Sequence, residues 1–344
     1  MGSKALWAAL FVGAACWGSA DRVFWSERLV GTFSMVALDP ETGDLGVVVQ
    51  SKFPNVRPIV PWAEAGVGAV ATQSYARLDY ARRGLALMRQ GATAEEALRI
   101  CLREDPHPEL RQVGMVDARG NAASWTGSAC FDWAGSNAGG NVGAKGRLVV
   151  GRFFAAQGNI LAGPEVVAAM VRAFEERRGP LAERLLAALV AGGQAGGDQR
   201  GEQSAALLVV RQGAGYDGLD NYIDISVYDH PSPIQELVRL YRLHQLYFSR
   251  SRPEDLIPIT PDIARELQQI WRARGFYSGP INGRVDTLFQ RILIDFMGWE
   301  NYDMRIEEVQ RVNLLRGDTL KIDRVVLEDI RRTFREGRWR PRTR

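Results

Sequence analysis

Short apolar runs, separated by turn residues, alternate with longer amphipathic segments along most of this chain. The run at 32–38 (TFSMVAL) is rich in strand-forming residues, and the turn-forming stretch 39–44 separates it from a second run at 45–52. A third run, 66–74, contains small residues that let a neighbouring layer approach closely. The pattern therefore predicts a hairpin followed by another strand.

Strands and helices then follow one another in pairs. Helices are expected at 79–90, 93–105, 164–177, 180–191 and 234–246, and strands at 112–117, 122–126, 204–211 and 222–227. The Gly-rich stretch 136–152 fits no element. Pairs of strands alternating with pairs of helices favour antiparallel sheets covered by helices over a doubly wound parallel sheet.

The chain has 344 residues, a length typical of two domains. Three prolines and several charges at 249–261 indicate a linker, and three helical segments are expected within 262–344. We therefore expect a large α/β domain at 32–248 and a small, Arg-rich helical domain after the linker.

The first 20 residues have the features of a Sec-type signal peptide, with Lys4, an apolar run at 5–15 and a small-residue cleavage site at 18–20. The apolar run is too short for a permanent membrane span. Residues 21–31 are interpreted as a short propeptide, and Cys16 leaves a lipoprotein open. The sequence therefore predicts an exported protein, in the periplasm, the cell wall or outside the cell.

The formal net charge is +3: the residues from Ser249 onward carry +4, and the rest of the chain carries −1. Nucleic-acid binders show a stronger basic stripe, so the asymmetry suggests at most an anionic polymer or surface.

Without the signal peptide two cysteines remain, Cys101 and Cys130, and whether they pair stays open. No metal-type cysteine spacing is present, no cofactor is expected, and a homo-oligomer is left open.

Only three histidines occur, so a Ser-His-Asp triad or a multi-His zinc site is hard to build. An enzyme without histidine can use a terminal threonine whose own α-amine, with a pKa of about 7.7 to 8.0, is the general base. Gly31–Thr32 is a plausible scissile bond, because it lies at a strand start in an exported precursor.

Closing the hairpin turn would place Thr32 opposite Ser51 or Lys52. The chain has four lysines, Lys52 among them, and 39 arginines. Either the Lys52 amine has a chemical role that a guanidinium could not fill, or Lys52 is an ordinary charge at a strand end.

Five segments resemble the domain-of-unknown-function family 1028, which is similar to the N-terminal-nucleophile hydrolases. These segments are Thr32–Ala37, Val49–Phe53, Gly66–Gln73, Ala156–Asn159 and Gly197–Ser204. The resemblance covers about 32–248. It implies an α+β fold, a four-layer αββα sandwich, and a threonine nucleophile.

By position, the resemblance implies that Thr32 is nucleophile and base and that Lys52 tunes its amine. Asp198 and Ser204 lie where the wider superfamily places groups that support the terminal amine. Gln50 stands at a strand end where proteasome-like chains have an acidic residue, which is a departure from proteasomal chemistry.

Three further amides, Gln73, Gln157 and Asn159, lie at predicted strand ends within the matching segments. They could orient a substrate amide, as could Gln50, or they could bond to buried backbone groups. The sequence does not decide between these roles.

Near the C-terminus, Leu267-Gln268, the stretch 275–283 (GFYSGPING) and Asp286-Thr287 resemble a peptidoglycan-binding domain. Asn282 stands where that family usually has Asp. Two functions follow as hypotheses: an exported amide-bond hydrolase acting on cell-wall peptide or another extracytoplasmic amide, or a non-catalytic wall-binding protein that keeps the hydrolase-like fold. Peptidoglycan or another anionic wall polymer is the expected partner, and nucleic acid is not.

Overall fold

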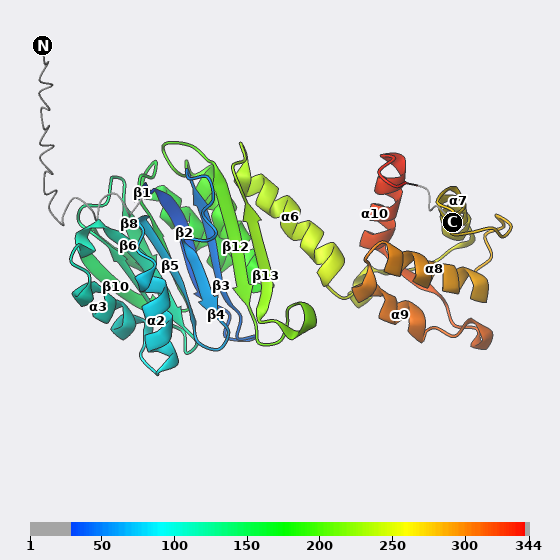
Figure 1. The fold of residues 1–344 in the computed structure, drawn as a ribbon, viewed down its shortest axis with the longest axis horizontal. Helices are drawn as coiled ribbons and strands as arrows, with labels where there is room; N and C mark the ends of the chain where they lie inside the picture. The colour runs from blue at the N-terminus through cyan, green and yellow to red at the C-terminus, as the bar shows by residue number, and fades with distance from the viewer. Residues whose placement is uncertain (1–28, 341–344) are drawn as a thin grey trace, which may run out of the picture. The chain divides into compact units, whose positions relative to one another are not determined.

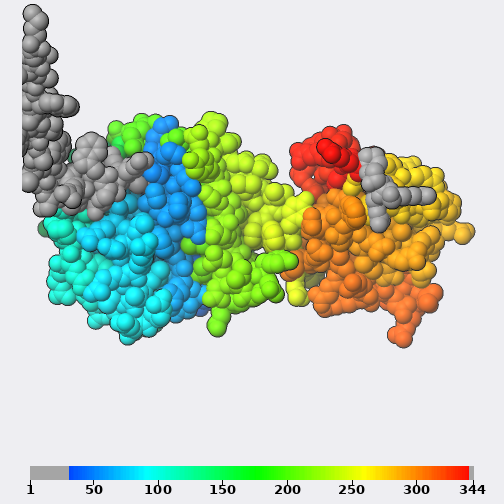
Figure 2. All heavy atoms as spheres, in the orientation of Figure 1, coloured from blue at the N-terminus to red at the C-terminus, as the bar shows by residue number. Residues whose placement is uncertain are grey.

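The computed structural model describes residues 29–340. The predicted signal peptide at 1–20, Cys16 and the part of the predicted propeptide before Leu29 lie outside the described residues. The chain divides into two compact units, which meet in sequence at Leu237 and Val238. Figure 2 shows the first unit in blue to green and the second in yellow to red.

The first unit contains two antiparallel sheets (Figure 1). The six-stranded sheet consists of β1 (Leu29–Val30), β4 (Pro61–Glu64), β5 (Gly68–Tyr75), β6 (Arg111–Asp117), β7 (Asn121–Thr126) and β10 (Arg147–Arg152). The seven-stranded sheet has the order β13-β12-β3-β2-β11-β8-β9. Its strands are β2 (Thr32–Leu38), β3 (Leu45–Ser51), β8 (Gly135–Ala138), β9 (Asn141–Gly143), β11 (Phe154–Gly158), β12 (Ser204–Val210) and β13 (Asn221–Val227).

Helices cover both sheets. α2 (Asp79–Arg89) and α3 (Ala94–Glu104) pack on the six-stranded sheet, and α4 (Glu165–Glu176) and α5 (Leu181–Gln194) pack on the seven-stranded sheet. The two sheets also contact one another, through β2 with β5 and β11 with β6. Aliphatic side chains from both sheets, Val36, Val47, Ala71 and Val116 among them, form a fully buried cluster. The first unit is therefore a mixed α/β structure with antiparallel sheets.

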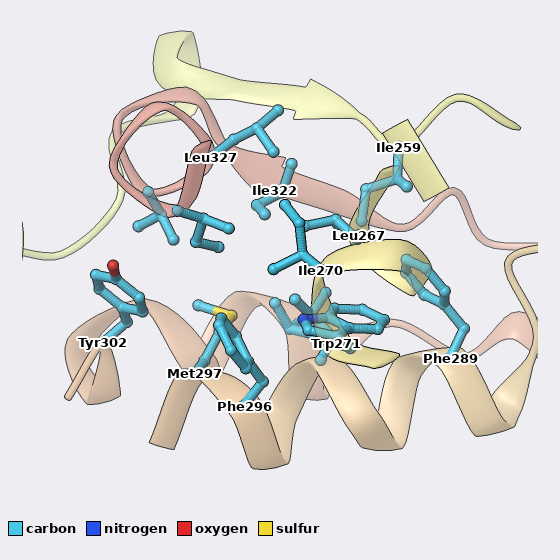
Figure 3. Close-up of a cluster of buried hydrophobic side chains, with 14 of the residues drawn as sticks. Ile259, Leu267, Ile270, Trp271, Phe289, Phe296, Met297, Tyr302, Ile322 and Leu327 are labelled. Atoms are coloured by element: carbon cyan, nitrogen blue, oxygen red, sulfur yellow. The ribbon is translucent and has the colours of Figure 1, made fainter. Parts of the chain in front are cut away.

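The second unit is mainly helical. It contains most of α6 (Pro233–Phe248), then α7 (Pro261–Ala273), α8 (Thr287–Trp299), α9 (Ile306–Arg311) and α10 (Arg324–Arg335), and a small sheet of β14 (Leu256–Pro258) and β15 (Lys321–Asp323). Trp271 lies at the centre of its core, with its ring 4.7 Å from that of Phe289 (Figure 3). The aliphatic side chains Leu267, Ile322 and Leu327 complete this layer.

Several predictions from the sequence are confirmed. Leu38 pairs with Leu45 and Thr32 with Ser51, one of the two registers expected for the hairpin. The helix predicted at 93–105 is α3, and a capping box of Thr93 and Glu96 opens it. The stretch 136–152, which fits no predicted element, forms most of β8 and the edge strands β9 and β10. β14 lies inside the stretch expected to be a linker, where it pairs with β15. Within residues 29–340, no helix is long and apolar enough to cross a membrane.

Candidate active site

Thr32 is the first residue of β2 and pairs with Ser51, the last residue of β3. The Thr32 hydroxyl donates a hydrogen bond to Ser51 Oγ at 3.0 Å, and the Ser51 hydroxyl donates to the carbonyl oxygen of Gly31 at 2.6 Å. Both side chains are buried. One buried serine therefore links the Thr32 hydroxyl to the peptide bond that precedes it.

Arg200 supplies a second donor to the same carbonyl. Its Nη2 lies 3.0 Å from the Gly31 oxygen, and the same nitrogen lies 2.6 Å from Asp198 Oδ2. Arg200 Nε donates to the other carboxylate oxygen at 3.0 Å. Because the Asp198 side chain is fully buried, it holds the guanidinium in a fixed direction. Two fixed donors on one carbonyl oxygen are the arrangement that stabilises an oxyanion.

The residues before Thr32 belong to the other sheet. β1 pairs with β5 in antiparallel register, Leu29 with Tyr75 and Val30 with Ser74, so the chain crosses between the sheets at Gly31. The carbonyl oxygen of Thr32 itself accepts hydrogen bonds from the Asn159 backbone at 3.0 Å and from Gln73 at 3.2 Å. The backbone on both sides of the Gly31–Thr32 bond is thus held in place.

Lys52 and Ser204 lie apart from this contact. Lys52 is exposed, and its Nζ lies 3.5 Å from the carbonyl oxygen of Glu202 in the loop before β12. Ser204 pairs with Ser51 across β12 and β3, but its hydroxyl oxygen accepts the backbone N–H of Val56. Ser51 is therefore the side chain that meets Thr32 directly, whereas the roles of Lys52 and Ser204 stay predictions.

Three of the predicted substrate-binding amides, Gln73, Gln157 and Asn159, are fully buried between the sheets. Gln73 accepts from the Ser34 hydroxyl at 2.6 Å and donates to Gln112, and Gln157 donates to the Ser34 hydroxyl at 2.6 Å. Asn159 donates to Gln112 at 2.8 Å. These contacts form a continuous amide layer that supports the backbone at Thr32.

Gln50 differs from the other amides. Its side chain is fully buried, and neither its nitrogen nor its oxygen has a hydrogen-bond partner among the described residues. Asn159 Oδ1 is unpartnered in the same way. The two oxygens can each accept a hydrogen bond from a water or ligand, and the Gln50 nitrogen can donate one.

Cys101 and Cys130 are both free and buried, which answers the question that the sequence left open. Burial raises the pKa of the Cys101 thiol to about 11 and also raises the pKa of Cys130. Because thiolates are the reactive form, neither cysteine is activated as a nucleophile. No group of His, Cys, Asp and Glu side chains within residues 29–340 could hold a metal ion.

Sequence reasoning missed three residues of this site. The hairpin register predicts Ser51 or Lys52 opposite Thr32, and no sequence signal assigns the Ser51 hydroxyl a role. Arg200 lies inside a matching segment, yet nothing in the sequence shows that it reaches Gly31 across 169 positions. Gln112 lies on a predicted strand, and only the packing of the two sheets brings it to Gln73 and Asn159.

A groove in the second unit lies between α7 and α10. Its volume is about 470 Å³, and it is lined by Glu266, Gln269, Ile270, Arg331, Phe334 and Arg335. Arg331 forms an ion pair with Glu266 at 2.7 Å, and Phe334 is 40% exposed. The groove thus combines the exposed Phe334 ring, the Arg331–Glu266 ion pair and the Arg335 guanidinium.

Two family models match the chain. The one described as "Family of unknown function (DUF1028)" matches residues 32–237, and the one described as "Putative peptidoglycan binding domain" matches residues 247–328. A solved protein of the DUF1028 family from Silicibacter pomeroyi is 30% identical, with a TM-score of 0.54, and the match covers 62% of this chain and 86% of that one. No curated protein matches the chain. Both resemblances seen in the sequence are confirmed, and the second match supports association with the cell wall.

Proposed function

Since the chain belongs to the DUF1028 family, whose description assigns no activity, we propose a function from the geometry around Thr32. The protein is an exported amide-bond hydrolase whose nucleophile is Thr32, freed as an N-terminal residue by cleavage of the Gly31–Thr32 bond. Its first unit is a four-layer αββα sandwich of the N-terminal-nucleophile type. The two sheets in contact, each with its own pair of helices, support this assignment.

One observation carries the proposal. The carbonyl oxygen of Gly31 accepts hydrogen bonds from Ser51 and Arg200, while the Thr32 hydroxyl donates to that same serine. A carbonyl that carries two fixed donors next to a hydroxyl is polarised for attack. After the segment before Thr32 has left, the same donors are available to a substrate carbonyl.

The chemistry follows from these groups. The free amine of Thr32 takes the hydroxyl proton as Oγ attacks the substrate carbonyl carbon, and Ser51 and Arg200 stabilise the resulting oxyanion. The carbon–nitrogen bond then breaks, and the amine passes the proton to the leaving nitrogen. A water attacks the ester in the same way, and Thr32 recovers its proton. Asp198 positions Arg200, and Lys52 contributes only positive charge at the end of β3.

The wall is the proposed place of action. The peptidoglycan-binding match supports a cell-wall polymer as partner of the second unit, which would hold the first unit near amides of the wall. Export agrees with this partner. The signal-like first 20 residues are the part of the sequence on which that step depends.

The test uses the exported full-length chain. Intact mass should show that the chain begins at Thr32, and brief exposure to p-nitrophenyl acetate should add one acetyl group that peptide mapping places on Thr32. Thr32→Ala should abolish that adduct. If residues before Thr32 remain attached, or if the adduct persists in Thr32→Ala, the hydrolase proposal is wrong, and a non-catalytic wall-binding protein becomes the better explanation.

A further inference from the structure

The segment before Thr32 lies where the acyl part of a substrate must lie. Gly31 contributes the carbonyl that Ser51 and Arg200 hold, and residues 29–30 continue from it as a strand on β5. If Thr32 is the nucleophile, then the carbonyl before it marks the position of the reacting carbonyl. The pairing of β1 with β5 marks the path of the chain that leads to it (Figure 1).

A β-carbon on Gly31 would force two neighbouring side chains, Arg200 and Ile160, to shift. A β-carbon built on it would meet Arg200 Nη2 at less than ordinary contact distance, would lie 2.8 Å from Arg200 Cζ, and would lie 2.7 Å from Ile160 Cδ1. Arg200 cannot move aside without losing either its bonds to the buried Asp198 carboxylate or its bond to the Gly31 carbonyl. A side chain at this position would therefore displace the donor on which the chemistry depends.

From these two observations we propose that the substrate is an extended peptide whose acyl-donating residue is glycine. This inference rests on the proposed function and narrows its substrate class. The peptide takes the place of residues 29–31: its backbone adds a strand to β5 beside Ser74 and Tyr75, and its glycyl carbonyl faces Ser51 and Arg200. Main-chain pairing binds the peptide with little regard to most side chains, and the crowding around position 31 selects glycine.

The reaction transfers a glycyl group. Thr32 Oγ forms an ester with the glycyl carbonyl carbon, the bond from that carbon to the amide nitrogen breaks, and the nitrogen leaves as an amine with the proton taken from Thr32. Water then cleaves the ester to give a peptide that ends in a glycine carboxylate. Both products are closed-shell species, and no oxidant, reductant or co-reactant other than water is needed.

The test uses the processed protein, residues 32–344. It compares the cleavage of coumarin amides of acetyl-Leu-Val-Gly, acetyl-Leu-Val-Ala and acetyl-Leu-Val-Val. We expect kcat/KM to fall at least tenfold from glycine to alanine and further for valine. The tripeptide glycine amide should also have a lower KM than acetyl-glycine coumarin amide, because only the tripeptide can pair with β5. Acetylation of Thr32 by p-nitrophenyl acetate reports the nucleophile independently of peptide binding.

A matched variant makes the steric cause testable. Ile160→Ala removes one of the two groups that crowd position 31 and keeps Arg200, so it should raise the alanine rate relative to the glycine rate severalfold. Two results would overturn the glycine inference and leave the nucleophile intact. One is equal kcat/KM for the glycine and alanine peptides. The other is no cleavage of any peptide by a protein whose Thr32 still reacts with p-nitrophenyl acetate. Failure of acetylation would instead remove the proposed function on which the inference rests.

Discussion

Ser51 connects the Thr32 hydroxyl to the carbonyl oxygen of Gly31. Replacing it with alanine removes one of the two donors to the Gly31 position and the acceptor of the Thr32 hydroxyl. Loss of one oxyanion donor typically lowers the rate of an acyl transfer by about 10²- to 10³-fold. We therefore expect Ser51→Ala to slow acetylation of Thr32 by roughly 100-fold, measured by intact mass over time on protein that begins at Thr32.

Ser124→Ala is the matched control for this change. Ser124 is also a fully buried serine on a sheet, but its hydroxyl donates to Val113 and Gln157 and does not contact Gly31. Its loss should lower stability by about 1 kcal/mol and leave the acetylation rate within a few-fold of the wild type. Equal slowing in both variants would show that Ser51 acts only through packing.

Cys101 provides a test of burial through pH. Its pKa in the folded chain is raised from 9.0 to about 11, because burial disfavours the thiolate. A raised pKa contributes stability that is complete below pH 9 and is lost as the pH rises toward 11. The melting temperature should therefore fall more between pH 8.5 and 10.5 in the wild type than in Cys101→Ala, while groups shared by both proteins cancel. An identical fall in both would contradict the burial of this thiol.

At the scale of elements, the sequence predicts those parts whose signal is local. The hairpin of β2 and β3 follows from two apolar runs around one turn, and its register already places Ser51 or Lys52 beside Thr32. The observed register decides between them: Ser51 pairs with Thr32 and shares its sheet face, and Lys52, the next residue, does not. The short strand β8 (GSNA) carries too little hydrophobic pattern to be recognised, and its pairing partner β11 comes from a later part of the chain.

The amide layer between the sheets could not be predicted, since it depends on which faces of β5, β6 and β11 meet. Gly114 on β6 gives room for it: a β-carbon there would lie 2.7 Å from Gln157 Cδ and 2.8 Å from its Nε2. Gly114→Ala should therefore lower the free energy of unfolding by about 1 to 3 kcal/mol, as overpacking of a close-packed interior does. The urea midpoint of the first unit measures this effect.

Gly163→Ala is the control for the same chemical change in open space. No heavy atom lies within 4 Å of a β-carbon at Gly163. Alanine there restricts the unfolded chain without a clash, so the midpoint should stay the same or rise slightly. A loss of stability as large as that of Gly114→Ala would show that crowding of the amide layer does not cause the loss at Gly114.

At the scale of the whole molecule, the structure shows where part of the positive charge of the second unit lies. Excess arginine in the second unit includes Arg331 and Arg335 in the groove between α7 and α10, beside the exposed ring of Phe334. The sequence could assign this unit to a wall polymer through its family motifs, but those motifs lie around the Trp271 core and in the turn at 275–283. The groove is formed by α7 and the later helix α10, which no motif marks.

The groove can be tested by co-sedimentation of the full-length protein with purified peptidoglycan. Arg335 is exposed and lines the groove, so Arg335→Glu replaces attraction to wall carboxylates with repulsion. We expect a roughly tenfold weaker affinity, which corresponds to about 1.4 kcal/mol. Arg316→Glu makes the same charge change at an exposed position of the same unit outside the groove, and it should reduce binding much less. Equal losses in the two variants would show that net charge, and not the groove, holds the polymer. Unchanged binding in both would place the wall contact on another surface of the chain.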